Sequence, residues 1–313
     1  MTAVDYQGAT AEAIRHHYDV SNEFFGLWLD TTRTYTCALW AEGESAEGGS
    51  AAGESAGDET TGDETAGGDT LESAQRRKLD YLIEGARAGG ARRVLDIGCG
   101  WGSLLDRLVT AHDVGHAVGL TLSDSQAEHL IGRALARTEV RVENWLDHEP
   151  AEGYDAVISI GAFEHFASTG LTRPARVAAY REFFERCRTW LPKGGRLALQ
   201  TNIKGNNVMM DRQTVADLLF IIEMIFPESE IPALSEVIEA SEKHFDVVTV
   251  RNDPDHYSRT CREWLRRLQA NRAAAVKCAG EQVVADYERY LGATVGHFEK
   301  RHLGLSRIIL ESV

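Results

Sequence analysis

The 313-residue sequence lacks the features that mark a membrane-spanning, secreted or metal-binding protein. No apolar run approaches the roughly 20 residues needed to cross a bilayer. The N-terminus has no basic stretch followed by an apolar one, as a signal peptide would. The five cysteines form no CxxC pair, and the adjacent His16 and His17 have no third ligand at metal spacing. These absences predict a cytoplasmic protein with reduced thiols and without a metal.

Positive charge is also scarce, because 33 Lys and Arg stand against 48 Asp and Glu and give a formal net charge of −15. This excess argues against a nucleic-acid partner and against an anionic membrane surface held by electrostatics. Nine of the negative charges, six Glu and three Asp, lie in residues 41–70, which otherwise contain only Ala, Gly, Ser and Thr. That low-complexity segment has almost nothing to bury, so we expect a disordered insertion. The rest of the chain is only about −6, which leaves room for a local basic patch.

Beyond the acidic segment, strand-like and helix-like stretches alternate. A helix is predicted over 71–88, where Gly89 and Gly90 would end it. Strands are predicted at 93–97, 116–122, 140–144, 156–160, 196–201, 245–250 and 306–310, and further helices at 103–111, 124–136 and 173–191. This alternation predicts an α/β, Rossmann-like fold with a mainly parallel seven-stranded sheet and helices on both faces. Such sheets bind ligands at the carboxyl ends of their strands.

Two segments fall outside this pattern. One is an N-terminal helical stretch over 11–29, and the other runs from 213 to about 271. The second begins with VADLLFIIEMIF, which is apolar on every side. A helix of that kind is either buried or forms the roof of an apolar cavity. We therefore expect both segments to form a helical lid over the strand ends.

The first motif with chemical content is VLDIGCGWG at 94–102. A strand that leads into Gly98, Gly100 and Gly102 and then a helix lets a ligand approach the backbone closely. A glycine triplet alone is also typical of dinucleotide enzymes, but here the acidic Asp96 precedes the glycines. The Lys-Ser/Thr pair of a triphosphate-binding loop is missing. The pattern favours a cationic cofactor without phosphate, and it is similar to motif I of the S-adenosylmethionine-dependent methyltransferases.

Five segments then occur in the order typical of one family. They are HYDVSNEFFGLWLDTTRTYTCALW (17–40), VLDIGCGWG (94–102), GLTLSDSQ (119–126), SIGAFEHF (159–166) and HYSRTCREWLRRLQAN (256–271). On these segments the chain resembles the cyclopropane-fatty-acid and mycolic-acid cyclopropane synthases, which are S-adenosylmethionine-dependent methyltransferases. The resemblance covers nearly the whole chain outside the acidic insertion.

The sequence pattern, together with the resemblance, predicts a division into four regions. Residues 1–40 would form an N-terminal helical lid that covers the cofactor, and 41–70 the acidic insertion. Residues 71–205 would be the S-adenosylmethionine-binding core. Residues 206–313 would form a substrate lid and complete the sheet.

The resemblance also implies a site for S-adenosylmethionine or S-adenosylhomocysteine. The residues that would line it are Tyr35, Thr36, Asp96, Gly98, Gly100, Thr121, Leu122, Gln126 and Trp145. Gln126 and Trp145 would contact the ribose and adenine ends. Thr121 and Leu122 stand where many other methyltransferases have an acidic ribose ligand. Asp96 could also cap the amides of the next helix, and the two uses are compatible.

A catalytic group is implied as well. Cys37, Glu164 and Tyr257 match positions that, in cyclopropane synthases, surround a bicarbonate thought to act as general base. A histidine from the fifth strand normally joins them, but here Gln200 stands in its place. A glutamine can hydrogen-bond an anion but carries no positive charge to hold it. This departure weakens the expectation of a bound bicarbonate, and hence of ring closure.

Structural interpretations compete with these roles. Cys37 could be a small buried apolar residue, and Tyr257 a core aromatic with a satisfied hydroxyl. His165 is expected to orient its loop, because the family places the chemistry on the neighbouring Glu164. The remaining cysteines are interpreted as packing or surface residues: Cys99, Cys187, Cys261 and Cys278.

Two reactions fit these residues. The first is methyl transfer to an apolar small molecule, at an alkene carbon or at a nitrogen or oxygen of a lipid or secondary metabolite. In it, Glu164 would face positive charge on the cofactor or on a developing carbocation. The second is ring formation in polyketide biosynthesis without methyl transfer, with Cys37 as nucleophile and Glu164 as proton shuttle. A role as a binding scaffold is less consistent with a cofactor loop beside a buried carboxylate.

Overall fold

The computed structural model describes residues 8–10, 12, 21–42 and 68–313 of the chain. The His16–His17 pair, residues 11 and 13–20 of the predicted N-terminal helix, and residues 43–67 of the acidic segment lie outside these residues. Within the described part, the N-terminal region contributes the short helix α2 (Asn22–Gly26), whose N-terminus is capped by the Ser21 side chain.

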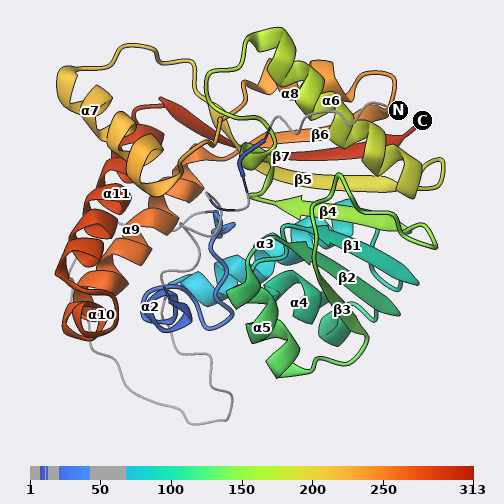
Figure 1. The fold of residues 1–313 in the computed structure, drawn as a ribbon, viewed down its shortest axis with the longest axis horizontal. Helices are drawn as coiled ribbons and strands as arrows, with labels where there is room; N and C mark the ends of the chain where they lie inside the picture. The colour runs from blue at the N-terminus through green and yellow to red at the C-terminus, as the bar shows by residue number, and fades with distance from the viewer. Residues whose placement is uncertain (1–7, 11, 13–20, 43–67) are drawn as a thin grey trace, which may run out of the picture.

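A seven-stranded sheet forms the centre of the protein (Figure 1). Its strands are β1 (Arg93–Ile97), β2 (His116–Thr121), β3 (Thr138–Val142), β4 (Ala156–Ile160), β5 (Arg196–Lys204), β6 (Phe245–Asn252) and β7 (Leu303–Ser312). Their order in the sheet is β3-β2-β1-β4-β5-β7-β6, and all neighbours are parallel except β7, which is antiparallel to both β5 and β6. The predicted fold class, a mainly parallel seven-stranded sheet, is confirmed.

Three predicted boundaries are corrected. The helix predicted over 71–88 is α3 (Leu71–Gly85), which ends before the glycine pair. The helix predicted to reach residue 136 is α5 (Asp124–Arg133), and it stops at Ala134, which has a positive φ of 48°. The strand predicted over 140–144 lies two residues earlier, as β3, so Glu143 and Asn144 fall in the loop beyond its carboxyl end.

Helices cover both faces of the sheet because alternate strand residues point to opposite sides. On one face, Leu95 and Ile97 pack with α6 (Arg173–Trp190) and α8 (Leu234–Ser241). On the other face, Val94 and Ala156 pack with α3 and α4 (Ser103–Ala111). The strands β1, β2 and β4 are therefore buried along nearly their whole length.

The remaining helices gather at the carboxyl ends of the parallel strands, at the left of Figure 1, beside α2. They are α7 (Arg212–Phe220), a π-helical turn η2 (Ile221–Ile225), α9 (Pro254–Ala270), α10 (Arg272–Ala279) and α11 (Glu281–Glu299). The all-apolar VADLLFIIEMIF stretch spans α7 and η2. It is not buried on every side: Val215, Leu219 and Met224 are exposed, while Leu218 and Ile222 line a cavity described below.

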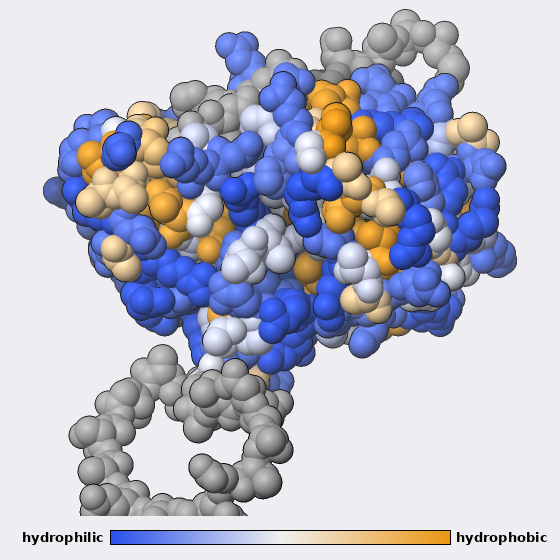
Figure 2. Space-filling model, turned by 90° about the horizontal axis from the view of Figure 1, so that it is seen from below, coloured by the Kyte–Doolittle hydropathy of each residue, from blue (hydrophilic) through white to orange (hydrophobic). Residues whose placement is uncertain are grey.

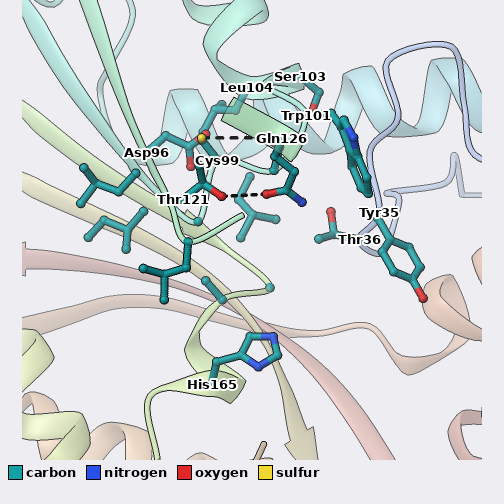
Figure 3. A pocket seen from close by; sticks show the side chains of 18 of the residues that line it. Tyr35, Thr36, Asp96, Cys99, Trp101, Ser103, Leu104, Thr121, Gln126 and His165 are labelled. Atoms are coloured by element: carbon teal, nitrogen blue, oxygen red, sulfur yellow. Dashed lines mark hydrogen bonds between the residues drawn. The ribbon is translucent and has the colours of Figure 1, made fainter. Parts of the chain in front are cut away.

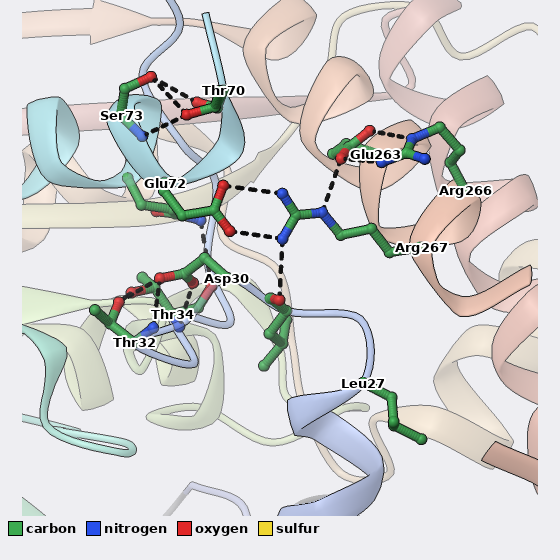
Figure 4. A network of polar contacts seen from close by, with 12 residues as sticks. Leu27, Asp30, Thr32, Thr34, Thr70, Glu72, Ser73, Glu263, Arg266 and Arg267 are labelled. Carbon is green, nitrogen blue, oxygen red and sulfur yellow. Dashed lines mark hydrogen bonds and ion pairs between the residues drawn. The ribbon is translucent and has the colours of Figure 1, made fainter. Parts of the chain in front are cut away.

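A polar network fastens the N-terminal segment to these helices (Figure 4). The guanidinium of Arg267 in α9 donates to both carboxylate oxygens of Glu72 in α3, at 2.7 and 2.9 Å, and to the carbonyl oxygen of Leu29 at 3.2 Å. The buried carboxylate of Asp30 accepts from the main-chain N–H of Thr34 at 2.7 Å. Two-pronged Arg–carboxylate contacts fix geometry as well as adding energy. This network holds residues 29–34 in place next to the strand ends.

The face shown in Figure 2 is mainly hydrophilic, with hydrophobic areas that are separated from one another. None of the helices in the described part of the chain is long and apolar enough to cross a membrane.

Candidate active site

A first cavity opens at the carboxyl ends of β1, β2 and β4 (Figure 3). It encloses about 950 Å³ between the atoms, including space open to solvent. All nine residues predicted to bind the cofactor line it: Tyr35, Thr36, Asp96, Gly98, Gly100, Thr121, Leu122, Gln126 and Trp145. In Figure 3 Tyr35 and Thr36 lie across the cavity from Asp96, Thr121 and Gln126.

The glycine loop has no room for a side chain at Gly98. Gly98 has a φ of +82°, and a Cβ added there would lie 2.5 Å from the Cβ of Ala162. Its main-chain N–H donates to the carbonyl oxygen of Leu120 at 3.0 Å, which ties the loop to β2. A left-handed conformation and a close neighbour together require glycine at this position. The loop can therefore approach a bound molecule with its backbone.

Asp96 is buried at the end of β1 and lines the first cavity. Burial raises the pKa of its carboxyl group to about 7, although the nearby Lys78 opposes this. Among the described residues none hydrogen-bonds to this carboxylate, and α4 begins without a side-chain cap. The interpretation of Asp96 as a cap for the next helix is therefore not supported.

Lys78 is a polar residue of this cavity that the sequence analysis missed. It lies on α3, is fully buried, and its Nζ donates to Thr36 Oγ1 at 2.9 Å. Burial, reinforced by the positive charge of Arg307, lowers the pKa of its ammonium group to about 7. The available signal was the spacing of Leu71, Gln75, Lys78 and Leu82, which places Lys78 on the same helix face as two leucines that are expected to be buried.

On the β2 and β3 side, the first cavity presents amide and carboxylate groups. Thr121 Oγ1 donates to Gln126 Oε1 at 2.8 Å, so the amide nitrogen of Gln126 is the end left for a ligand. Glu143, in the loop beyond β3, also lines the cavity, and its Oε2 lies 3.2 Å from Nδ1 of the buried His148. Trp145 packs against Phe166, with ring centroids 5.1 Å apart.

A second cavity of about 940 Å³ lies between the ends of β4, β5 and β7 and the helices α7, η2, α9 and α11. The four residues predicted to be catalytic all line it: Cys37, Glu164, Gln200 and Tyr257. Apolar residues from the helices and β7 form most of the remaining wall, among them Leu218, Ile221, Ile222, Phe226, Phe298 and Leu305. Residues distant in the sequence therefore meet around one largely apolar chamber.

The two cavities adjoin, because both are lined by Tyr35, Thr36, Gly161 and His165. Gly161, with a φ of +70°, brings the end of β4 against Thr36, whose Cγ2 would lie 2.8 Å from an added Cβ. Across this boundary, Tyr35 Oη donates to Tyr290 Oη at 3.3 Å. The two cavities are therefore direct neighbours that share this wall.

Glu164 lies in a single 3₁₀ turn, η1 (Phe163–His165), directly after β4. It lines the second cavity and not the first. Its Oε1 accepts from the main-chain N–H of Asn202 at 2.6 Å, whereas Oε2 is buried without a hydrogen-bond partner among the described residues. Burial raises the pKa of the carboxyl group to about 7, so both protonation states are accessible near neutral pH.

His165 lines both cavities, and its Nδ1 lies 2.7 Å from Ser229 Oγ. Burial lowers the pKa of this imidazole to about 4, so it is neutral near pH 7. On the other side of the second cavity, burial raises the pKa of the Cys37 thiol to about 11 and that of the Tyr257 phenol well above its usual value. Cys37 is therefore a poor thiolate source at neutral pH.

Gln200 is buried on β5, and its neighbour on β7 is the second residue missed from the sequence. The guanidinium of Arg307 donates through Nε to Gln200 Oε1 at 2.8 Å and through an Nη to the carbonyl oxygen of Ala38 at 3.0 Å. Arg307 also forms an ion pair with Asp253. A charged residue inside the apolar strand LGLSRIIL was the available signal. Its partner, 107 residues away, could not be read from the spacing.

The strand order, the glycine loop and the cavity at the carboxyl ends of the strands define the class of S-adenosylmethionine-dependent methyltransferases. Among relatives, cyclopropane mycolic acid synthase 2 from Mycobacterium leprae is 31% identical over 96% of this chain and 93% of its own length. The solved cyclopropane synthase MmaA2 from Mycobacterium tuberculosis superposes with a TM-score of 0.82 at 29% identity, covering 97% of this chain and 99% of that one. Mycolic acid cyclopropane synthase CmaA1, solved with SAH and CTAB, gives a TM-score of 0.82 at 28% identity, covering 98% and 100%.

The sequence description of the mycolic acid cyclopropane synthetase family matches residues 6–308. The chain belongs to this family. It is an S-adenosylmethionine-dependent methyltransferase of the cyclopropane-synthase type.

Proposed function

We propose that this enzyme transfers the methyl group of S-adenosylmethionine to an alkene carbon of a lipid-like substrate held in the second cavity. The observation that carries the proposal is the pair of adjoining cavities, one rich in polar groups and one largely apolar with the buried carboxyl of Glu164 in its wall. A donor and an acceptor bound on either side of Tyr35 and Gly161 would meet at the shared boundary.

The first cavity fits S-adenosylmethionine, which supplies an electrophilic methyl group when bound. Asp96 would receive the ammonium group of the cofactor, and the side chains of Lys78 and Arg33, which also line the cavity, are available for its carboxylate. Thr121, Leu122, Gln126 and Trp145 would hold the nucleoside, as the family resemblance implies. The absence of side chains at Gly98 and Gly100, which both line this cavity, would allow the backbone to come close to the cofactor.

The second cavity fits the chemistry of an alkene. Methyl addition to a double bond leaves a carbocation on the substrate, and its charge has to be stabilised and a proton removed. The ionised carboxylate of Glu164, which lines this cavity, would stabilise that charge. Cys37, Gln200 and Tyr257 complete the wall around that position. Closure by α7 and η2 would keep water away from the cation.

The substrate is proposed to be an apolar chain with a double bond. Supporting this, the second cavity is lined mainly by aliphatic and aromatic side chains, and the related CmaA1 structure is described as a complex with CTAB. Related proteins are named as synthases of cyclopropane mycolic acids and hydroxymycolates. The product, whether a cyclopropane or a methylated alkene, depends on which proton leaves.

The test is incubation of the purified protein with methyl-labelled S-adenosylmethionine and a set of monounsaturated lipids, with saturated lipids of equal length as controls. Label in the unsaturated lipids alone supports transfer to an alkene carbon. Label in saturated amines or alcohols would show that the methyl acceptor is a nitrogen or an oxygen atom. Cofactor binding without label in any lipid would contradict the proposal.

Ring formation without methyl transfer is the second candidate, and two observations weigh against it. The chain belongs to a family of methyl-transferring synthases. The thiol proposed as its nucleophile, Cys37, has a raised pKa and is thus a weak nucleophile at neutral pH. Turnover of a polyketide substrate in the presence of S-adenosylhomocysteine instead of S-adenosylmethionine would favour this candidate.

A further inference from the structure

Residues 34–36, here called the partition, form part of the wall between the two cavities. Tyr35 and Thr36 line both cavities, and Thr34 lines the first. These residues belong to no helix or strand, so no ladder of main-chain hydrogen bonds fixes their position. The place of the partition therefore depends on contacts with the elements around it.

Two side chains of α3 hold the partition from one side. Nε2 of Gln75 donates to the carbonyl oxygen of Thr34 at 3.2 Å and to that of Thr36 at 2.8 Å. Nζ of Lys78 donates to Thr36 Oγ1 at 2.9 Å. Residues three apart on a helix lie on the same face. One face of α3 thus binds both the main chain and a side chain of the partition.

Both of these polar residues are buried at a cost to the fold. Gln75 is 1% exposed, and its Oε1 has no hydrogen-bond partner among the described residues. Lys78 is 0% exposed, and the acceptor of its Nζ within the described part of the chain is the neutral hydroxyl of Thr36. Leu71 and Leu82 fill the same face of α3 without such a cost. Buried polar groups that are incompletely paired call for an explanation, and the hold on the partition supplies one.

On its other side, the partition packs against the end of β4 and against aromatic rings. A Cβ added to Gly161 would lie 2.8 Å from Thr36 Cγ2, so the methyl group of Thr36 occupies the place next to this glycine. The ring of Tyr35 lies 5.2 Å from those of Trp28 and Trp264, measured between centroids. Thr36 is therefore fixed through its hydroxyl to α3 and through its methyl group to β4.

We propose that Gln75 and Lys78 are positioning residues for methyl transfer, because they hold the partition where the methyl group of the cofactor and the substrate can meet. Gln75 lines neither cavity, so it can act only through the partition. Reacting atoms have to lie about 3–3.5 Å apart, and a misplacement of about 1 Å can slow a reaction about 100-fold. The inference rests on the proposed function for the reaction, but the hold on the partition is measurable without it.

The test is a double-mutant cycle between Lys78 and Thr36, measured as the rate constant of methyl transfer at saturating cofactor and lipid. Lys78→Met removes Nζ, Thr36→Val replaces the hydroxyl by a methyl group, and a third variant carries both changes. Gln75→Leu removes the two contacts with the main chain independently. Arg76→Met is the matched control, because Arg76 is exposed on the same helix. Hydrogen–deuterium exchange, S-adenosylmethionine affinity and thermal unfolding are measured on the same preparations.

Lys78→Met and Thr36→Val are each expected to lower the rate constant about tenfold, because each removes the same hydrogen bond. The double variant should be no slower than the slower single variant, since residues in contact are not additive. Gln75→Leu should lower the rate constant by a similar factor, with S-adenosylmethionine affinity within about threefold of wild type. A purely structural role of Lys78 would instead give effects that multiply in the double variant.

The exchange measurement reports on the partition itself. In Lys78→Met and Gln75→Leu, the main-chain amides of residues 34–36 should exchange faster than in wild type, while those of β1 exchange as before. Arg76→Met should match wild type in exchange and in the rate constant. Faster exchange that is spread equally over the whole chain would mean general destabilisation and would contradict a local hold.

Three results would overturn the inference. They are effects of Lys78→Met and Thr36→Val that multiply, a Gln75→Leu variant with the wild-type rate constant, and unchanged exchange of residues 34–36 in both α3 variants. If Lys78→Met does not fold, the rate constant and the exchange of Gln75→Leu decide. A wild-type protein that transfers no methyl group, although its partition loosens in these variants, contradicts the proposed function. Methyl transfer that is insensitive to Gln75→Leu contradicts this inference alone.

Discussion

The main-chain N–H of Asn202 donates to Glu164 Oε1 at 2.6 Å, across the junction of β5 and the turn that follows β4. This contact helps to orient a buried carboxyl group whose other oxygen, Oε2, is without a hydrogen-bond partner among the described residues. An unpartnered buried acceptor is unfavourable for folding and is typical of functional sites. When it is ionised, the carboxylate of Glu164 presents negative charge to the second cavity.

Glu164→Gln is therefore expected to lower the rate of methyl transfer by about 100-fold or more, because the carbocation loses its counter-charge. S-adenosylmethionine affinity should change little, since Glu164 does not line the first cavity. In wild type the rate should rise with pH up to about 7, where the carboxyl group ionises. The rate–pH profile and the cofactor dissociation constant check this.

The same variant gives a stability prediction with a definite sign. The folded pKa of Glu164 is raised from 4.5 to about 7, so the folded state holds a proton that the unfolded state releases between those values. The stability that the protonated Glu164 contributes is complete below about pH 4.5 and is lost as the pH rises to about 7. Glu164→Gln should therefore gain stability relative to wild type across that window. A constant difference in urea unfolding at pH 4.5 and pH 7.5 would contradict the burial argument.

Gly98→Ala is expected to weaken S-adenosylmethionine binding by at least about tenfold and to destabilise the protein by about 1–3 kcal/mol. The positive φ and the Cβ of Ala162 at 2.5 Å both oppose a side chain there. Gly132→Ala, in α5, is the matched control, because an added Cβ at Gly132 meets nothing within 4 Å. Calorimetric titration with the cofactor and thermal unfolding measure the two effects. Equal cofactor affinities for the two variants would refute the close-approach argument.

Lys78→Met should change the pH dependence of stability in the opposite direction to Glu164→Gln. The pKa of Lys78 is lowered from 10.5 to about 7, so folding releases a proton between those values and wild type gains stability as pH rises through them. The free energy of unfolding of Lys78→Met minus that of wild type should therefore be larger at pH 7 than at pH 9.5. Lys193→Met, at an exposed position, serves as the control and should show no such trend. Chemical unfolding at the two pH values measures it.

The helical wall of the second cavity can be tested by filling it. Ile222→Trp should reduce methyl transfer to long-chain substrates by about tenfold or more, because Ile222 lines the cavity. Cofactor binding should be unaffected. Leu219→Trp, three residues away on the exposed side of α7, should behave as wild type. If both tryptophan variants keep full activity on long chains, the substrate does not occupy this chamber.

The features that depend on local sequence pattern, the strands and the position of the first cavity, could be predicted from the sequence. Apolar runs such as VLDI and AVISI fixed the strands, and the glycine loop with Asp96 located the first cavity, because strand ends of a parallel sheet meet at one edge. The predictions erred where a boundary depends on backbone conformation. For example, α5 ends at Ala134, which has a positive φ, and alanine is not a residue from which a positive φ would be predicted.

Which residues lie in and behind the wall of the second cavity depends on tertiary contacts. Gln200 was recognised as a departure from the family pattern, but its neighbour Arg307 comes from an antiparallel strand 107 residues later, whose register no local pattern specifies. The 3₁₀ turn that carries Glu164 likewise decides which cavity the carboxylate faces. Lys78 was overlooked because lysine on a helix is ordinarily exposed, although its position on the apolar stripe indicated burial.

The most direct test of alkene methylation uses S-adenosylmethionine with a trideuterated methyl group and a lipid with one cis double bond. Mass spectrometry of the recovered lipid should show deuterium at the former double bond. Two deuterium atoms on the added carbon would mean that the methyl group lost a deuteron and closed a ring. Three deuterium atoms would mean that a neighbouring carbon of the lipid lost the proton instead. A lipid recovered without deuterium, although the protein binds the cofactor and the lipid, would contradict the account.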